Sequence, residues 1–420
     1  MRIVHLNTYD IMGGAARAAF RLHCGLVGLG HDSTMLVKHR TSRDPRVVEF
    51  VPSMDLPNRW RRWSRRRAIA RRAAIYSATR PPGLEPFNGD RTPYGDRVIE
   101  QVPQCDVMNV HWIATYIDYE QFFPRASELS HIVWTLHDMN AVTGGCHYDL
   151  ECKRFAQRCG TCPQLGSRDP DDLAAQTWDR KRALFEQVDP RRFCIVTPSQ
   201  WLGDVARRSP ILRRFRVETI PYGIDVNDFA PRDRGAARDV LGVPQDADVV
   251  LFVADVLDNR RKGFALLVDA LSRCAASVDR LWLLSVGHNP PKLGGDVRGS
   301  HLGYIDNDRF LSLAYSAADL FVIPSLQDNL PNTVMEAMAC GTPVVGFDVG
   351  GIRDMVREGV TGSLIDSGDV EGLHDSIVAL LKSPSTRQKM SEQARQIALA
   401  EYPLQRQAQR YSDLYERLAA

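Results

Sequence analysis

The chain has 420 residues, of which 44% are hydrophobic and 25% are charged, and its formal net charge is only +2. The length exceeds the size at which one hydrophobic core stops growing, so two domains are expected. The near-neutral charge gives no overall case for nucleic-acid binding, and no stretch approaches the roughly 20 apolar residues that span a bilayer. Because Arg2 to Asn7 forms a strand pattern instead of a secretory signal, we expect a cytoplasmic protein with reduced cysteines.

The N-terminal half follows the strand–helix–strand rhythm of a parallel sheet. After the first strand, Gly13 and Gly14 form a turn that would allow a ligand to approach the backbone closely. An ordinary tight turn is the alternative interpretation. Apolar residues then recur at helical spacing from residue 16 to Leu29, and Gly30 ends this helix. Further strands are expected at Ser33–Lys38, Val107–Val110, Ile132–Leu136 and Cys194–Thr197.

Residues 58–74 form a strongly basic stretch, with eight arginines and the tryptophans Trp60 and Trp63. A basic helix with tryptophans is typical of a patch that lies on an anionic membrane surface. The alternative is a solvated helix face on an insertion. We do not expect nucleic acid to bind this stretch, because nothing else in the sequence supports such a partner.

Two histidines follow predicted strands of this half. His137 comes directly after the strand Ile132–Leu136, and ligands of open α/β sheets bind beyond the carboxyl ends of the strands. A histidine at that place is able to orient or polarise a hydroxyl group. His111, which follows Val107–Val110, is a second candidate, and a structural role is the alternative for either residue.

Four of the nine cysteines lie in the loop 144–166, with the spacing C-x5-C-x6-C-x2-C. These four are Cys146, Cys152, Cys159 and Cys162. Four thiols with one C-x2-C pair suit a structural, tetrahedral zinc site, in which His147 could replace one ligand. In a reducing cytosol, zinc is favoured over disulfides. The alternative is a set of reduced, partly buried thiols.

The second half repeats the strand–helix rhythm after an interruption near residues 215–235, where proline and glycine indicate a domain boundary. Two successive α/β units imply two sheets with a cleft between them. An amphipathic helix near Leu404–Leu418 follows them. The expected strands are Val249–Val253, Leu281–Val286, Leu320–Ile323 and Pro343–Phe347, and the expected helices are Gly263–Cys274, Asp308–Ala317 and Pro331–Cys340.

The segment Pro324–Val345 is the strongest candidate for a ligand site. A polar loop there precedes a helix opened by Pro331, and proline suits the first helical turn. The N–H groups and the positive dipole end of that helix favour an anion such as a diphosphate. Asn332 and Glu336 lie one turn apart, where a carboxylate is able to accept both hydroxyls of a ribose. The alternative is an ordinary βαβ unit with Glu336 on a solvated face.

This segment resembles the carboxylate-x7-carboxylate motif of glycosyltransferase family 4, with Glu336 as the second carboxylate and Asp328 where that family usually has Glu. The cysteine loop is similar to one in the branch of the family that builds colanic-acid-like and capsular polysaccharides. The resemblance covers nearly the whole chain. Further segments that match the family are Gly13–Gly14, Val196–Asp204, Ile220–Pro231, Arg260–Leu271 and Asp348–Val356.

The resemblance implies a GT-B fold, in which two Rossmann-like, doubly wound domains face a central cleft. The first domain is expected at residues 1–217, with the basic insertion 58–74 and the cysteine loop 144–166, and the second at 218–402. A C-terminal helix at 403–420 would pack back on the first domain. In the family, the reaction retains the configuration of the anomeric carbon.

The resemblance also implies roles for individual residues. Asp328 would lie near the donor sugar, Glu336 would contact the nucleotide ribose, and a histidine matching His137 lies near the reacting sugar. Lys262 with Arg261 would meet the donor phosphates, whereas a solvated surface lysine is the alternative for Lys262. The expected donor-binding residues are Gly13, Gly14, Arg261, Lys262, Leu330, Asn332, Thr333 and Glu336.

We therefore expect a hexosyl-type transferase that moves a sugar from a UDP- or GDP-linked donor to a hydroxyl of a growing, lipid-linked polysaccharide. The protein would lie peripherally on the inner face of the cell membrane. Lys262, Arg261 and the helix dipole would stabilise the diphosphate leaving group, so no cofactor is required for catalysis. One alternative is a catalytically silent protein that binds nucleotide sugars, which Asp at position 328 makes conceivable. The other is a GT-B nucleotide-sugar epimerase.

Overall fold

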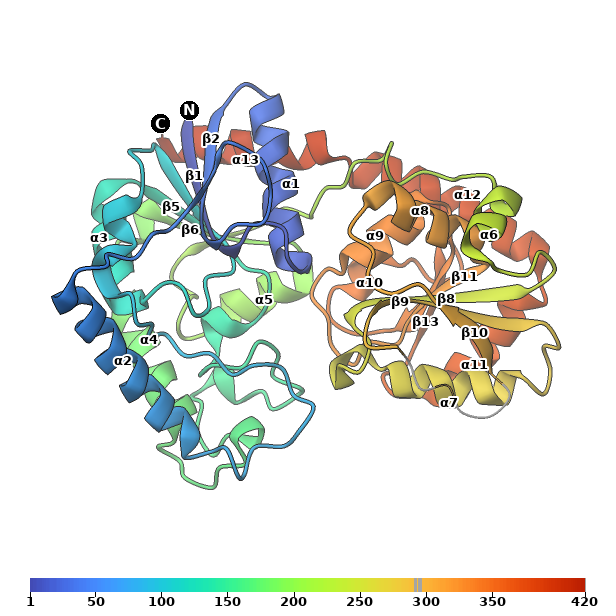
Figure 1. Ribbon diagram of the computed structural model, residues 1–420, viewed down its shortest axis with the longest axis horizontal. Helices are drawn as coiled ribbons and strands as arrows, with labels where there is room; N and C mark the ends of the chain where they lie inside the picture. Colours follow the sequence, from blue (N-terminus) through green and yellow to red (C-terminus); the bar gives the residue numbers. More distant parts are fainter. Residues whose placement is uncertain (291–292, 294–296, 420) are drawn as a thin grey trace. The chain divides into compact units, whose positions relative to one another are not determined.

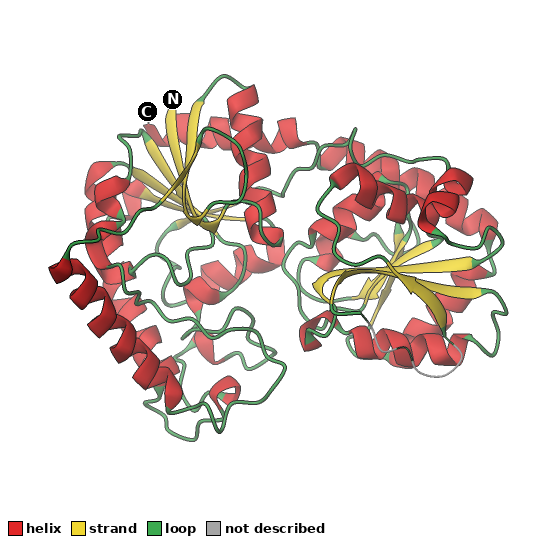
Figure 2. Cartoon of the chain, viewed as in Figure 1, coloured by secondary structure: helices red, strands yellow, loops and turns green. Residues whose placement is uncertain are grey.

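The computed structural model describes residues 1–290, 293 and 297–419, which form two α/β units (Figure 1). The first unit comprises residues 1–221 and 407–420, and the second comprises residues 222–406. Each unit holds one parallel sheet with helices on both of its faces (Figure 2). Strands of a sheet covered on both faces are apolar throughout, which explains why the central strands show no in–out alternation.

The sheet of the first unit has seven parallel strands in the order β3-β2-β1-β4-β5-β6-β7. The strand order changes direction between β1 and β4, and the carboxyl ends of such strands form the crevice in which open α/β sheets bind ligands. The strands are β1 (Arg2–Tyr9), β2 (Asp32–His39), β3 (Val47–Glu49), β4 (Val107–Val110), β5 (His131–Thr135), β6 (Phe193–Thr197) and β7 (Arg216–Thr219).

Aspartate or serine residues begin most helices of this unit. Asp118 and Asp172, for example, accept hydrogen bonds from the backbone N–H groups three residues later at the start of α3 and α4. Among the described residues, no helix is long and apolar enough to cross a membrane. The helices are α1 (Gly14–Gly28), α2 (Leu56–Ala74), α3 (Tyr119–Leu129), α4 (Leu173–Gln187), α5 (Gln200–Arg208) and α13 (Leu404–Ala419).

The C-terminal helix α13 completes the core of the first unit. Its residues Tyr411, Leu414 and Tyr415 are fully buried against apolar side chains of β1, α1, β4, β5 and β6. Asn109 donates a hydrogen bond to the hydroxyl of Tyr415 at 2.7 Å, and Thr135 lies 3.0 Å from the hydroxyl of Tyr411. Helix α13 therefore packs on the first sheet.

The sheet of the second unit has six parallel strands in the order β10-β9-β8-β11-β12-β13. The strands are β8 (Asp248–Val256), β9 (Leu281–His288), β10 (Arg298–His301), β11 (Leu320–Ile323), β12 (Val344–Phe347) and β13 (Gly362–Ile365). The helices are α6 (Arg234–Leu241), α7 (Phe264–Cys274), α8 (Asp308–Ala317), α9 (Asn332–Ala339), α10 (Ile352–Met355), α11 (Val370–Leu381) and α12 (Pro384–Glu401).

All strands and helices that the sequence predicts are present, with small shifts at their ends. Helix α9 begins at Asn332, because Pro331 is its N-cap in an extended conformation rather than its first helical residue. Leu29 lies beyond the end of α1 and is 40% exposed. Sequence analysis missed β3, β7, β10 and β13, which are the four sheet-edge strands. Each has three or four residues that are only partly buried and include polar side chains or glycine, whereas central strands of the same length, such as β4 and β11, are buried at every position.

Candidate functional site

The segments that follow β8 and β11 meet where the strand order of the second sheet changes direction. The short helix η7 (Arg260–Lys262) follows β8, and the polar loop that leads into α9 follows β11. Strands β8 and β11 are neighbours in this sheet. The carboxyl ends of such a strand pair form the crevice in which open α/β sheets bind ligands. The residues predicted to bind the donor in this unit therefore lie where the fold favours a ligand.

Asp328 is the electrostatic centre of this site. Its carboxylate is 2.6 Å from the ammonium of Lys262 and 3.3 Å from the guanidinium of Arg261. Ser325 also donates a hydrogen bond to it at 3.2 Å. Burial alone would raise the pKa of Asp328, but the two cations outweigh burial and lower that pKa to about 2. Asp328 is thus ionised at neutral pH, and Lys262 is no solvated surface lysine.

Backbone contacts lock the loops around this ion pair. Leu326 donates its N–H to the carbonyl of Arg261 at 2.8 Å, and the Arg261 guanidinium donates to the carbonyl of Gln327 at 2.7 Å. Gly263 has φ +70°, and a Cβ there would lie 1.8 Å from the carbonyl oxygen of Pro324. Gly350 has φ +53°, and a Cβ there would lie 1.9 Å from the carbonyl oxygen of Asp328. Both positions therefore require glycine.

Glu336, one of the predicted ligand residues, lies on α9. Its side chain is only 3% exposed, which excludes the solvated helix face that was the alternative interpretation. The hydroxyl of Tyr315 donates a hydrogen bond to Oε2 of Glu336 at 3.0 Å. Leu330 is buried immediately before α9, whereas Asn332 and Thr333 are half-buried in its first turn. The sequence held no signal for Tyr315, because this residue comes from another helix.

The predicted residues of the first unit lie near the carboxyl ends of its strands. Gly13, with φ +83°, is the N-cap of α1, which begins at Gly14. His137 follows β5, and its Nε2 lies 3.0 Å from Nδ1 of His111. Burial lowers the pKa of His137 to about 4, so its imidazole is neutral at pH 7. Gly13, Gly14 and His137 belong to the first unit, whereas the other residues predicted to bind the donor belong to the second.

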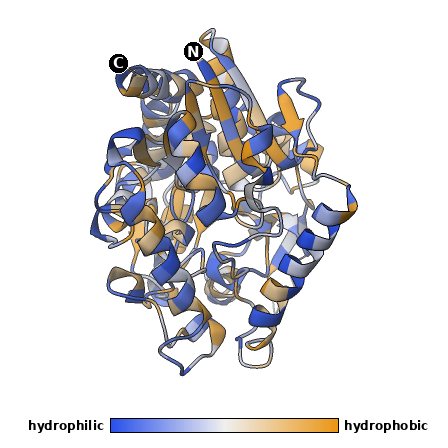
Figure 3. Ribbon diagram, turned by 90° about the vertical axis from the view of Figure 1, so that its left-hand side faces the viewer, coloured by the Kyte–Doolittle hydropathy of each residue, from blue (hydrophilic) through white to orange (hydrophobic). Residues whose placement is uncertain are grey.

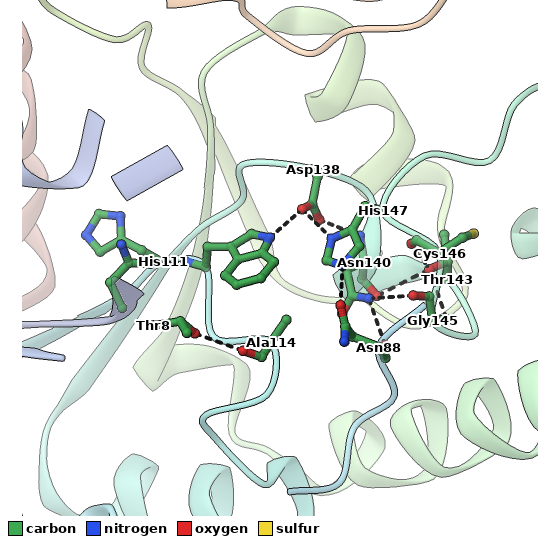
Figure 4. Close-up of polar contacts among 12 residues, drawn as sticks. Thr8, Asn88, His111, Ala114, Asp138, Asn140, Thr143, Gly145, Cys146 and His147 are labelled. Carbon is green, nitrogen blue, oxygen red and sulfur yellow. Dashed lines mark hydrogen bonds and ion pairs between the residues drawn. The ribbon is translucent and has the colours of Figure 1, made fainter. Parts of the chain in front are cut away.

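A polar network that sequence analysis did not anticipate surrounds the residue after His137 (Figure 4). Asp138 accepts hydrogen bonds from Nδ1 of His147 at 2.6 Å and from the indole of Trp112 at 2.8 Å. Nε2 of His147 lies 2.8 Å from the amide oxygen of Asn88. Burial would lower the pKa of His147, but Asp138 outweighs burial and raises it. His147 is thus engaged through both ring nitrogens in this arrangement.

The four clustered cysteines line one small cavity of about 20 Å³. Burial raises the pKa of Cys146 and Cys162 above the ordinary value, and that of Cys159 to about 12, so these groups are thiols at neutral pH. The backbone N–H of Gly144 donates to the sulfur of Cys159 at 3.2 Å. Within the described part of the chain, no three or more His, Cys, Asp or Glu side chains are already arranged to hold a metal ion.

A family model described as glycosyl transferases group 1 matches residues 247–383, which include η7, the Asp328 loop and α9. The chain is 35% identical over 249 residues to a D-inositol 3-phosphate glycosyltransferase of Geodermatophilus obscurus, covering 54% of this chain and 48% of that protein. It is 31% identical over 247 residues to an alpha-maltose-1-phosphate synthase of Mycobacterium tuberculosis, covering 54% and 63%. The match thus spans about half the length of these curated relatives.

Solved structures share the fold of the whole chain. The sucrose-phosphate synthase of Thermosynechococcus elongatus has a TM-score of 0.68 at 20% identity, covering 100% of this chain and 99% of that one. Anabaena HepE in complex with UDP and glucose has a TM-score of 0.65 at 16% identity, covering 99% of both chains. These neighbours have the GT-B fold, so the predicted pair of Rossmann-like domains is confirmed.

The buried ion pair predicts a specific loss of stability. The pKa of Asp328 falls from 3.8 to about 2 on folding, so its stabilisation is complete above about pH 4 and is lost as the pH falls toward 2. We expect Asp328→Asn to lower the free energy of unfolding of the second unit by roughly 2–3 kcal/mol at pH 7. Urea unfolding at pH 7 measures this change.

The matched control is Asp269→Asn, which removes an exposed carboxylate paired with Arg273 on α7. It should change the free energy of unfolding by less than about 0.5 kcal/mol. Equal effects of the two substitutions would contradict the assignment of Asp328 as a buried electrostatic centre.

Proposed function

We propose that the protein is a retaining glycosyltransferase that moves a sugar from a UDP- or GDP-linked donor to a hydroxyl group. The pairing of Asp328 with Lys262 and Arg261, beside the N-terminal end of α9, carries this proposal. It lies within the segment that matches the glycosyltransferase family. Structures of the same fold with bound UDP or UDP-glucose support a nucleotide-sugar donor.

The charges of this site suit a nucleoside diphosphate. Lys262 and Arg261 carry two positive charges, and Asp328 neutralises only one of them. The remaining positive charge and the N–H groups of Asn332 and Thr333 at the start of α9 favour an incoming diphosphate. When the bond between the sugar and the diphosphate breaks, the same groups stabilise the negative charge that develops on the leaving group. In this scheme the transfer step needs no divalent metal.

We propose that Glu336 accepts hydrogen bonds from the hydroxyls of the nucleotide ribose. Tyr315 donates to Oε2 of Glu336 and so fixes the orientation of the carboxylate inside the second unit. Asp328 lies nearer the phosphate-binding cations and contacts the donor sugar in this proposal. His137 has a pKa of about 4, so it is neutral at pH 7 and does not act as a general acid. In this proposal it orients a sugar hydroxyl through a hydrogen bond.

Two substitutions test the donor site. Lys262→Ala should lower kcat by about 10²- to 10³-fold, because it removes a cation that acts on the leaving group. Glu336→Ala should raise KM for the donor, because it removes the ribose contact in ground state and transition state alike. Transfer and donor hydrolysis by the purified protein, with UDP-, GDP- and ADP-linked sugars, measure both effects. Lys389→Ala and Glu392→Ala, exposed residues of α12, are the controls and should leave activity unchanged.

Other outcomes of the same experiment identify the alternatives. Binding of UDP, GDP or ADP seen as a thermal shift, without transfer or hydrolysis, would indicate a silent nucleotide-sugar-binding protein. A changed sugar without a new glycosidic bond would indicate an epimerase. Full activity of both Lys262→Ala and Glu336→Ala would reject the proposed site.

We propose that the acceptor is a lipid-linked polysaccharide and that helix α2 holds this cytoplasmic protein peripherally on an anionic membrane. None of the 19 side chains of α2, all of which the structure describes, is buried. Figure 3 shows this helix largely in hydrophilic colours. Trp60 and Trp63 are nevertheless 69% and 55% exposed. Arg65, on the opposite side of the helix, pairs with Asp118 and anchors α2 to the first unit.

Co-sedimentation with vesicles tests the membrane proposal. Arg71→Glu/Arg72→Glu changes two exposed arginines in the last turn of α2 and should weaken binding to anionic vesicles at least tenfold, since each basic residue contributes about 1 kcal/mol. The control Lys382→Glu/Lys389→Glu makes the same change of charge on the second unit and should bind as the wild type does. Equal binding of the wild type to neutral and anionic vesicles would contradict an electrostatic membrane patch.

We also propose that Cys146, Cys152, Cys159 and Cys162 bind a structural zinc ion. The four thiols share one cavity, and a buried N–H group already points at Cys159. Zinc binds thiolates, so binding requires small shifts of these side chains and the release of their protons. We expect protein purified at pH 7.5 to retain about one zinc per chain and to lose it on acidification toward pH 5. Metal analysis with thiol titration measures this, and four reactive thiols without zinc would reject the site.

A further inference from the structure

Three buried histidines form a hydrogen-bonded row across the first sheet. His5 lies on β1, and its Nδ1 is 2.9 Å from Nε2 of His111, which follows β4. The next link joins Nδ1 of His111 to Nε2 of His137 at 3.0 Å. The centroids of neighbouring rings are 5.2 and 5.3 Å apart. Because β1, β4 and β5 are consecutive in the sheet, each strand contributes one ring to the row.

Each ring of the row carries a single proton at neutral pH. Burial lowers the pKa of all three histidines, and the next ring, that of His23 at 5.9 Å from His5, is also neutral because burial lowers its pKa to about 4. A neutral imidazole donates through one nitrogen and accepts through the other. His111 is bonded on both sides, so the two hydrogen bonds must run in the same direction. The row therefore has two possible polarities.

The environment of His5 selects between them. Its Nε2 is buried and has no hydrogen-bond partner among the described residues. If His5 donates from Nδ1 to His111, its Nε2 is an unprotonated acceptor without a partner. If the row runs the other way, Nε2 of His5 is a buried N–H group without a partner. Orphaned buried N–H groups are rarer in proteins than under-satisfied acceptors, so the row runs from His5 through His111 to His137.

We propose that His5 and His111 are positioning residues that hold neutral His137 with its proton on Nδ1. In this polarity Nε2 of His137 accepts the hydrogen bond of His111, so the ring proton of His137 lies on Nδ1, and the ring is able to act toward other groups only as a donor. It is therefore no general base. The inference deepens the proposed function, on which it rests for the sugar hydroxyl that His137 orients.

The tautomer of His137 is the direct test. A two-dimensional ¹H–¹⁵N spectrum of the ¹⁵N-histidine-labelled full-length protein distinguishes a protonated ring nitrogen from an unprotonated one. We expect His137, assigned by the signals lost in His137→Gln, to show a protonated Nδ1 and an unprotonated Nε2. A protonated Nε2 in the wild type would overturn the inference, whatever the activity of the protein.

Substitutions at His5 test the row without touching His137. Asn places an amide N–H where Nδ1 of His5 stands, so His5→Asn should keep the His137 tautomer and most of the activity. His5→Leu lacks this donor, so we expect a mixture of His137 tautomers and kcat lowered roughly 10- to 100-fold, as for a lost orienting partner, with little change in KM for the donor. His111→Phe should have the same or a larger effect. His374→Asn, at a histidine of the second unit that pairs with Asp375, is the control and should change neither readout.

The outcomes separate this inference from the proposed function. A protonated Nδ1 in the wild type that is lost in His5→Leu supports the row even if no sugar transfer is found. Sugar transfer with unchanged His137 signals in both His5→Leu and His111→Phe would overturn the row and leave the proposed function standing. If His111→Phe does not fold, the His137 tautomers in His5→Asn and His5→Leu still show whether the row sets the tautomer.

Discussion

The pairing of one buried carboxylate with two cations organises the second unit. Lys262 and Arg261 follow β8, whereas Asp328 follows β11, so their attraction ties together the two segments that leave neighbouring strands. Gly263 and Gly350 allow the backbones to approach closely enough for this pairing. The same interaction thus shapes the loops that follow both strands.

In the first unit, burial keeps three histidines uncharged, whereas in the second it encloses an ion pair. Three histidines in or after β1, β4 and β5 are neutral, because removal from water suppresses their charge. Asp138 and His147 differ from them, since the carboxylate outweighs burial and raises the pKa of His147. The two units therefore differ in their chemistry: the second holds an ionised carboxylate between two cations, whereas the first holds neutral imidazoles linked by directional hydrogen bonds.

The sequence predicted the central elements of both sheets because their strands are buried apolar runs between helices of regular period. It did not predict β3, β7, β10 and β13, since these edge strands are only partly buried and need little apolar surface. Lys262, Asp328 and Glu336 were recognised through a family motif. The contact between Lys262 and Asp328 was not, because 66 residues separate them and only the fold brings them together. The same holds for Tyr315 beside Glu336 and for His5, which in the sequence is one of several polar residues of the first strand.

The return of α13 to the first sheet affects how the chain acquires its structure during synthesis. Tyr411, Leu414 and Tyr415 leave the ribosome only after all of residues 222–406, yet they fill the core around Ile3 and Leu22. Until then, β1 and α1 expose an apolar surface, while the second unit is already able to fold as a continuous stretch of chain. The core of the first unit is therefore completed only when its last helix has been made, and a chain truncated before residue 407 is expected to be prone to aggregation.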